Sequence, residues 1–142
     1  MRDVLVVSCL ALSVFLAMAT SGDDKENKKE QKKVESTEAT FEGSAEALFR
    51  AYDENEIEAD IQYKGKVLEI SGKIDSIGKD IMDEPYVTLR VGRTFGSVQC
   101  MFSKSSSQQL VRLRKGQAVV LKGRCAGKMV NVILRGCVVS KQ

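Results

Sequence analysis

The chain has 142 residues, of which 43% are hydrophobic and 29% are charged, and its formal net charge is +3. This length is enough for one globular domain and no more. The sequence contains no histidine, and this excludes most metal sites, general-base mechanisms and pH switches that operate near neutrality.

The first nineteen residues have the pattern of a cleaved secretory signal peptide. Arg2 precedes an apolar run from Val4 to Met18, and Ala17-Met18-Ala19 is a small-x-small cleavage sequence. The run is shorter than the roughly 17 to 25 residues of a membrane span. Cys9 lies too early in it for a lipoprotein cleavage site, which puts lipid anchoring in doubt. The sequence therefore predicts export to the periplasm or the outside, with no integral membrane span after cleavage.

Residues 20–40 are predicted to form a disordered, charged tether. The stretch from Asp23 to Lys33 contains no apolar residue and has nearly balanced charge, so it cannot bury a core. Its lysines would also suit a basic tail, but the interleaved acids cancel most of their charge. The globular domain is predicted to span residues 41–142.

Two helices are predicted at the start of this domain. The first has apolar residues at the i, i+3, i+4 and i+7 spacing of an amphipathic helix: Ala45, Leu48, Phe49 and Tyr52. Asn55 and Glu58 form a capping box that begins a second short helix, with Ile57 and Ile61 on one side of it. Both helices are expected to pack on the rest of the domain. The alternative is a helical surface that binds a partner.

Alternation of apolar and polar residues predicts five strands. The first is long, from Tyr63 to Ile77, and Gly72 on its buried side lets it bend and pass another backbone closely. The other four strands contain these apolar or small positions: Val87, Leu89 and Val91; Val98, Cys100 and Phe102; Val119, Leu121, Gly123 and Cys125; Val130, Val132 and Leu134. A helix with Leu110 and Leu113 is predicted between strands three and four, and a tight turn at residues 126–128 between strands four and five.

Three strands, a helix and two further strands follow one another in the order of an OB-fold. The sequence therefore predicts a mainly β domain, a five-stranded OB-fold Greek-key barrel. An N-terminal helical segment precedes the barrel, and a helix lies between its strands three and four.

Spaced tyrosine, glycine and cysteine positions also carry a family resemblance. These are Ala51-Tyr52, Asn55-Glu56, Ala59-Asp60, Tyr63-Lys64-Gly65-Lys66, Gly72, Cys100-Met101-Phe102, Lys115-Gly116, Gly123-Arg124-Cys125-Ala126-Gly127 and Leu134-Arg135-Gly136-Cys137. The chain resembles the tRNA_anti-like family of exported bacterial proteins over about residues 44–139. This resemblance implies an OB-fold domain, often behind a lipoprotein signal, and the family's ligands are largely unknown.

The uneven distribution of charge is the main indication of function. From Pro85 to the end there is no acidic residue, while from Phe41 to Glu84 acids outnumber bases by twelve to five. OB-folds bind ligands along strands two and three and the adjoining loops, and a basic groove there would suit a polyanion. The predicted ligand-binding residues are Tyr86, Arg90, Arg93, Lys128 and Arg135. The alternative is that the acidic half neutralises the basic half internally.

The sequence predicts an exported, non-catalytic binding module without a cofactor. Its first predicted ligand is an oligonucleotide or another polyanion, and the alternative is an envelope scaffold that binds protein or glycan. Aromatic stacking residues are few, and the loop between strands one and two is acidic, which weighs against nucleic acid. No CxxC pair and no phosphate-binding glycine loop is present, so the sequence favours no enzyme class.

Three cysteines lie in the predicted barrel. In an OB-fold, strands three and five run parallel, with Cys100 late in one and Cys137 at the end of the other, so Cys100–Cys137 is the favoured disulfide. Cys125 would then be a buried free thiol. Three unpaired, packed cysteines are the open alternative.

Overall fold

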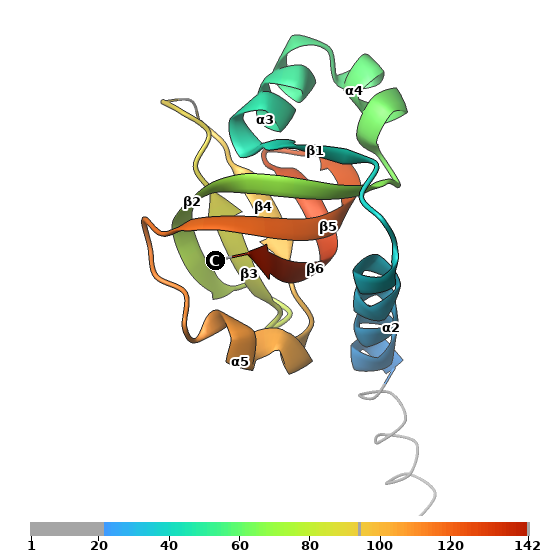
Figure 1. Cartoon of the computed structure of the whole chain (residues 1–142), viewed down its shortest axis with the longest axis vertical. Coiled ribbons are helices and arrows are strands. Elements are labelled where there is room, and N and C mark those ends of the chain that lie inside the picture. The colour runs from blue at the N-terminus through green and yellow to red at the C-terminus, as the bar shows by residue number, and fades with distance from the viewer. Residues whose placement is uncertain (1–21, 94, 142) are drawn as a thin grey trace, which may run out of the picture.

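A long strand, β2 (Val67–Lys79), organises the barrel in the computed structural model, which describes residues 22–93 and 95–141. The other elements are α2 (Gly22–Ser36), β1 (Phe41–Ser44), α3 (Ala45–Glu54), α4 (Glu56–Tyr63), β3 (Pro85–Leu89), β4 (Val98–Met101), a 3₁₀ turn (Lys104–Ser106), α5 (Ser107–Leu110), β5 (Ala118–Lys128) and β6 (Val132–Lys141). Figure 1 shows α3 and α4 above the barrel, α5 below it and α2 at its side. Within the described residues, no helix is both long and apolar enough to cross a membrane.

Strand β2 takes part in two halves of one closed sheet. Its first half pairs with β5 and its second half with β3, so the strand order β2-β3-β4-β6-β5 returns to β2. The change of partner occurs near Gly72, where an added Cβ would lie 3.2 Å from Leu89 Cβ and 3.3 Å from Ala45 Cβ. A larger residue would therefore push apart the strand and the helix that cross here. This confirms the OB-fold barrel and gives the reason for the glycine in its first strand.

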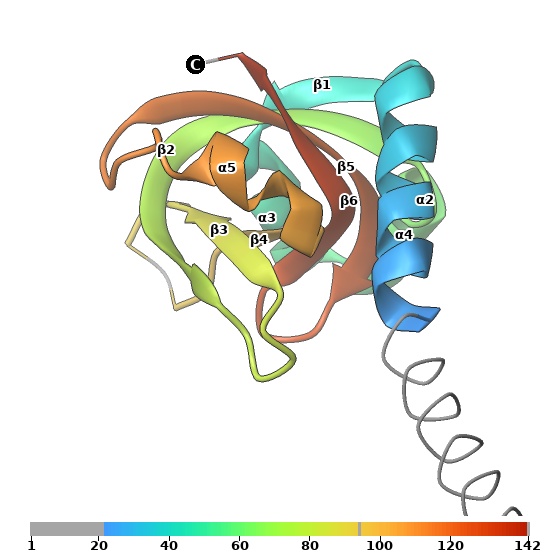
Figure 2. The ribbon, with the colours of Figure 1, turned by 90° about the horizontal axis from the view of Figure 1, so that it is seen from below.

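The barrel interior holds the apolar residues that the alternation predicts. Leu68, Ile70, Val87, Leu121 and Leu134 are each fully buried. Figure 2 shows the strands curving around this core, with α5 across one open end. Parallel pairing of β4 with β6, as predicted for strands three and five, places Cys100 opposite Leu134.

Helix α3 closes the other end of the barrel. Its buried residues are the four of the predicted stripe: Ala45, Leu48, Phe49 and Tyr52. Asn55 caps α4, and its Oδ1 accepts a hydrogen bond from the Glu58 backbone N–H at 3.2 Å. Helix α4 packs against β5 as expected, but it does so through Ala59, its buried residue, while Ile57 and Ile61 are both about three-quarters exposed.

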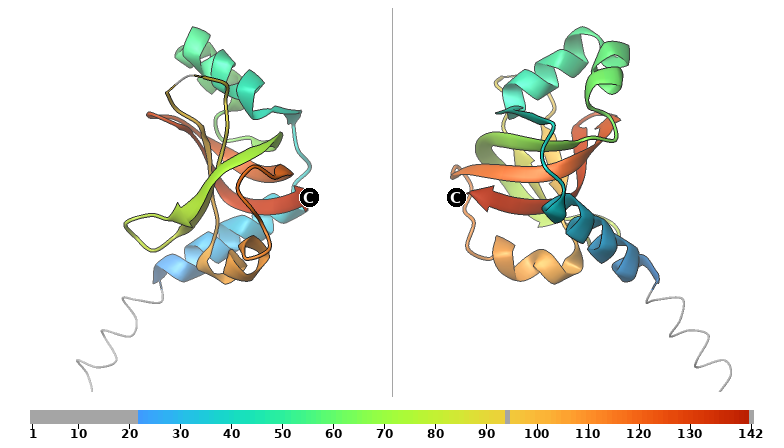
Figure 3. Two further views of the ribbon diagram at one scale, coloured as in Figure 1. Left: turned by 90° about the vertical axis from the view of Figure 1, so that its left-hand side faces the viewer. Right: turned by 45° about the vertical axis from the view of Figure 1, so that its right-hand side comes forward.

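The structure differs from the predicted tether at residues 20–40, where it has helix α2. The glutamates, lysines and glutamines of this stretch are good helix formers, and helical spacing gathers Asn27, Glu30, Gln31 and Val34 on one face. Helix α2 lies against β6 and β5, and the right-hand view of Figure 3 shows it beside the barrel. The predicted signal peptide, residues 1–19, lies outside the described residues.

Polar side chains supply most contacts between α2 and the barrel. Gln31 Nε2 donates to Ser106 Oγ at 2.6 Å, and Asn27 is hydrogen-bonded to Glu84. Val34 is fully buried, and a Cβ on Gly136 would lie 3.2 Å from its Cγ2. Gly136 has a φ of 61°, so this position both needs glycine and leaves room for the helix.

The tight turn predicted at residues 126–128 is also wrong. Strand β5 continues through Lys128, and the chain turns at residues 129–131, where the Met129 N–H donates to the Asn131 carbonyl at 3.0 Å. The register shifts between Cys125 and Gly127, so that Ala126 has no partner on β6 and Gly127 pairs with Ile133 within the strand. As a result, Cys125 lies opposite Leu134.

Candidate nucleic-acid interface

Four of the five predicted site residues make contacts that limit their availability to a ligand. The Arg90 guanidinium pairs with Asp75 at 3.4 Å, across the β2–β3 pairing. Lys128 Nζ lies 3.4 Å from Asp53 Oδ1 and 5.1 Å from the Phe49 ring centroid. These two cations therefore bind the N-terminal half of the domain, as internal charge complementarity requires.

Tyr86 and Arg135 are restricted in other ways. Tyr86 is half-buried, and its ring packs over Gly78, where an added Cβ would lie 3.0 Å from the tyrosine oxygen. Arg135 is exposed, but it shares a groove of about 330 Å³ with Glu84 and two α2 glutamates, Glu26 and Glu30. An incoming phosphate would meet negative charge on most sides of this arginine.

Arg93, the fifth residue, is exposed and has no ion-pair partner within the described residues. It lies in the β3–β4 connection close to Phe95, whose side chain is fully exposed. An aromatic ring in water beside a free guanidinium is the combination that single-stranded nucleic acids use, since bases stack on the ring and phosphates pair with the cation.

The β5–β6 connection lies beside this β3–β4 connection. Ser97 N–H donates to Asn131 Oδ1 at 3.0 Å, and the Val132 N–H donates to the Ser97 carbonyl at 3.1 Å. Met129 and Val130 are 87% and 75% exposed. We call Arg93, Phe95, Met129 and Val130 together the loop rim; it borders strands β3 and β4, where OB-folds bind their ligands.

The outer face of β3 and β4, next to the loop rim, is already hydrogen-bonded within itself. Asn131 Nδ2 donates to Gln99 Oε1 at 3.0 Å, and the hydroxyls of Ser76 and Thr88 lie 2.6 Å apart. Thr88 is also largely buried. The loop rim is therefore more accessible to a ligand than the strands below it.

A tyrosine and the cysteines of the barrel are buried, and burial raises the pKa values of Tyr52, Cys125 and Cys137. The Tyr52 hydroxyl bonds Asp60 Oδ1 at 3.1 Å and Cys125 Sγ at 3.3 Å, and burial raises the pKa of Tyr52 far above its usual value. Burial likewise raises the pKa of the Cys125 thiol. Burial and a hydrogen bond with Cys100 raise the pKa of Cys137. A protonated thiol is a poor nucleophile and metal ligand.

All three described cysteines are free thiols in this structure. Cys100 nevertheless lies near enough to Cys137 to raise the pKa of its thiol, and the Cys100–Cys137 pairing stays a prediction. Within the described part of the chain, no three carboxylate or thiol side chains gather as a metal site would require.

Sequence reasoning missed two parts of the basic surface. Phe95 is not among the predicted site residues; it is fully exposed, and its loop meets the β5–β6 connection through a contact between residues distant in sequence, Ser97 and Asn131. The unpaired cations Lys73, Arg112 and Lys141 lie on another side of the barrel. Only the absence of acids after Pro85 could have indicated Arg112 and Lys141.

Comparison with known structures supports the barrel assignment. A crystal structure from Klebsiella pneumoniae, of a lipoprotein for which nucleic-acid binding has been suggested, matches with a TM-score of 0.59 and 22% identity, over 70% of this chain and 91% of that one. This likeness shows a shared fold.

Two further structures match less closely. An OBody bound to hen egg-white lysozyme has a TM-score of 0.43 and 13% identity, over 57% of this chain and 87% of that one. A crystal structure of yeast Stn1 and Ten1 matches with a TM-score of 0.45 and 15% identity, over 75% of this chain and 65% of that one. No curated protein sequence matches the chain.

A family model extends over almost the whole sequence. The tRNA_anti-like model matches residues 1–138, which include the barrel and the tyrosine, glycine and cysteine positions that carry the resemblance. The chain therefore belongs to the tRNA_anti-like family.

Proposed function

We propose that this protein is a non-catalytic OB-fold module that binds single-stranded nucleic acid at the loop rim. The observation that carries the proposal is the fully exposed Phe95 beside the unpaired Arg93 at the border of the OB-fold ligand face. A base would stack on the Phe95 ring, while the Arg93 guanidinium contacts a neighbouring phosphate. Met129 and Val130 provide apolar surface for the next base.

The structural neighbour from Klebsiella and the charge distribution of this chain support nucleic acid as the ligand. Nucleic-acid binding has been suggested for the Klebsiella lipoprotein that shares the fold. The segment from Pro85 onward has eleven lysines and arginines and no acid. Arg90 and Lys128, which the sequence placed in the site, are expected to contribute less because each already pairs with a carboxylate.

Substitution of Phe95 tests this proposal. Base–aromatic stacking contributes about 1 to 3 kcal/mol per base, so Phe95→Ala should weaken binding of a fluorescent oligothymidylate by roughly 5- to 150-fold. Phe95→Tyr should bind nearly as well as the wild type. Ile61→Ala removes another exposed apolar side chain, from α4, and should change nothing. Equal affinity of Phe95→Ala and wild type would reject the loop rim as the site.

A protein-binding scaffold is the second candidate function. It is favoured by the exposed Ile57 and Ile61 on one side of α4, in addition to the apolar tips of the loop rim. Salt dependence separates the two functions, because phosphate contacts weaken linearly in log–log salt and a mostly apolar protein interface does not.

We also propose that the protein acts outside the cytoplasm. The signal-like pattern of residues 1–19 and the lipoprotein among the structural neighbours support export. Mass spectrometry of exported material should find a mature N-terminus near Thr20. An intact Met1 on protein recovered from the cytosol would contradict export.

A further inference from the structure

A basic surface without a lining carboxylate lies on another side of the barrel, between α5 and the end of β6. A groove of about 530 Å³ there is lined by Gln108, Gln109, Val111, Arg112, Val139, Ser140 and Lys141. A second groove of about 390 Å³ shares Lys141 and is lined otherwise by Ser71, Gly72, Lys73, Ala118, Val119 and Val120. Because they share a residue, the two form one surface, which we call the α5–β6 groove.

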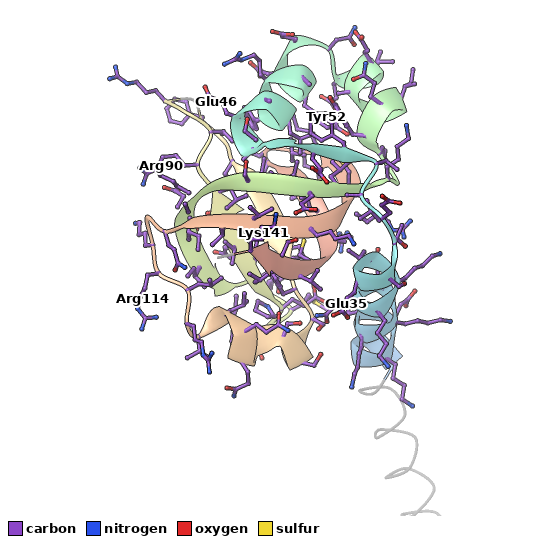
Figure 4. All side chains as sticks on the ribbon, in the orientation of Figure 1. Glu35, Glu46, Tyr52, Arg90, Arg114 and Lys141 are labelled. Atoms are coloured by element: carbon purple, nitrogen blue, oxygen red, sulfur yellow. The ribbon has the colours of Figure 1, made fainter. Side chains whose placement is uncertain are left out.

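Strand register brings two of its lysines onto the same part of the surface. Lys73 on β2 lies opposite Ala118, and Lys141 on β6 lies opposite Val120, so the two lysines flank β5. The two lysine Cα atoms are two strand spacings apart across the sheet and two residues apart along the strands, which gives a separation of roughly 12 Å. Figure 4 shows Lys141 at the front of the barrel and Arg114 on the adjoining α5–β5 connection.

The cations of this groove differ from those of the predicted site in being unpaired. Lys73, Arg112 and Lys141 are exposed, and none has a carboxylate partner among the residues that the structure describes. By contrast, Arg90 and Lys128 pair with acids of the N-terminal half. Charge that is not neutralised within the fold is available to a ligand.

The neighbouring groups suit an oxyanion more than an apolar ligand. Gln108 and Gln109 offer amide donors, whereas the Ser140 hydroxyl proton is already donated to Glu69. Glu69 is the acid in contact with this surface, since its Oε1 accepts a hydrogen bond from Ser140 Oγ at 3.0 Å. Three cations against this one carboxylate, with the Cα atoms of Lys73 and Lys141 roughly 12 Å apart, match a chain of phosphates better than a single phosphate.

We propose that the α5–β6 groove binds the phosphate backbone of single-stranded nucleic acid and is the main electrostatic contact of this protein. This inference rests on the proposed function for the identity of the ligand, but it concerns a surface separate from the loop rim. The rim then supplies base stacking, and the groove supplies the salt-dependent part of the affinity.

The test measures oligothymidylate affinity against salt for the wild type and for Lys73→Gln/Arg112→Gln/Lys141→Gln. Each phosphate contact on a single strand contributes about 0.7 to the log–log salt slope, so losing three should reduce the slope by about 2. Between about 50 and about 200 mM salt, the wild type should therefore lose roughly 20-fold more affinity than the variant. A matched control, Lys28→Gln/Lys32→Gln/Lys66→Gln, removes three exposed lysines that line neither part of the groove and should keep the wild-type slope.

The outcomes separate this inference from the proposed function. If Phe95→Ala weakens binding but the groove variant keeps the wild-type salt slope, the groove proposal is overturned and the loop rim remains the proposed site. A reduced slope with no effect of Phe95→Ala would support the groove and reject the rim. No binding by the wild type at low salt would overturn both.

Two further measurements test which ligand the α5–β6 groove binds. Glu69→Gln keeps an acceptor for Ser140 but removes the nearby negative charge, and it should strengthen oligonucleotide binding by up to about fivefold at low salt. Vesicles with phosphatidylglycerol present phosphates on a lipid surface. Groove-dependent binding to these vesicles, without groove-dependent binding to the oligonucleotide, would overturn the nucleic-acid assignment.

Discussion

Docking of helix α2 can be tested through its one fully buried side chain, Val34. Val34→Asn removes about 1.5 to 3 kcal/mol of burial and places an amide where it has no partner, at a further cost of about 1 to 3 kcal/mol. The remaining contacts are weak: hydrogen bonds worth about 1 kcal/mol each and a 3.8 Å pair between Glu30 and Arg124 worth about 0 to 1 kcal/mol. We therefore expect α2 to undock while the barrel stays folded.

Amide hydrogen exchange measures this local opening. A loss of about 3 kcal/mol corresponds to roughly hundredfold faster exchange, confined to residues 22–36. Lys32→Asn introduces the same residue on the exposed side of α2. Its helix-propensity cost is at least as large as that of Val34→Asn, because lysine is a better helix former than valine, yet it should leave docking intact. Equal protection of α2 in Val34→Asn and Lys32→Asn would refute the docking argument. Unprotected α2 amides in the wild type would favour the disordered tether instead.

Three further predictions concern the barrel. Gly123→Ala should cost about 1 to 3 kcal/mol in urea unfolding, because its Cβ would lie 2.5 Å from Cys137 Sγ and 3.0 Å from Leu134 Cβ; wild-type stability would contradict the packing. The pKa values of Cys125 and Cys137 are raised in the folded state. As the pH rises, the unfolded state therefore releases these thiol protons before the folded state does. Under reducing conditions, the free energy of unfolding should therefore stay constant below a pH of about 8.5 and fall above it by up to about 1.4 kcal/mol per pH unit for each thiol. A free energy of unfolding that stays constant up to a pH of about 9.5 would contradict this. Under oxidised glutathione, peptide mapping should recover Cys100–Cys137, since Cys100 is the thiol that influences the pKa of Cys137; a Cys125–Cys137 peptide would contradict this pairing.

Local pattern was enough to predict the barrel. Alternation along β2 identified its buried face, and the glycine at position 72 indicated the bend where two strands and a helix meet. The stripe from Ala45 to Tyr52 predicted the buried side of α3. These signals lie within a few residues of one another, so a single sequence contains them.

Contacts between residues distant in the sequence explain where the structure differs from the sequence prediction. Helix α2 is held by the burial of Val34 and by hydrogen bonds of Asn27 with Glu84 and of Gln31 with Ser106, and no local pattern reveals such distant partners. The same limit applies to the site, since Lys128 pairs with Asp53 across 75 residues. The uneven charge of the two halves indicated that some cations would be neutralised, but not which ones would stay free.

The central claim, that the loop rim binds single-stranded nucleic acid, is tested most directly by amide chemical-shift mapping. Labelled protein would be titrated with oligothymidylate at low salt, where phosphate affinity is greatest. We predict shifts in residues 93–97 and 129–131 that saturate with the oligonucleotide, together with shifts along the α5–β6 groove and none around Ile57 and Ile61. No saturable shifts at low salt, or shifts confined to α4, would contradict the claim.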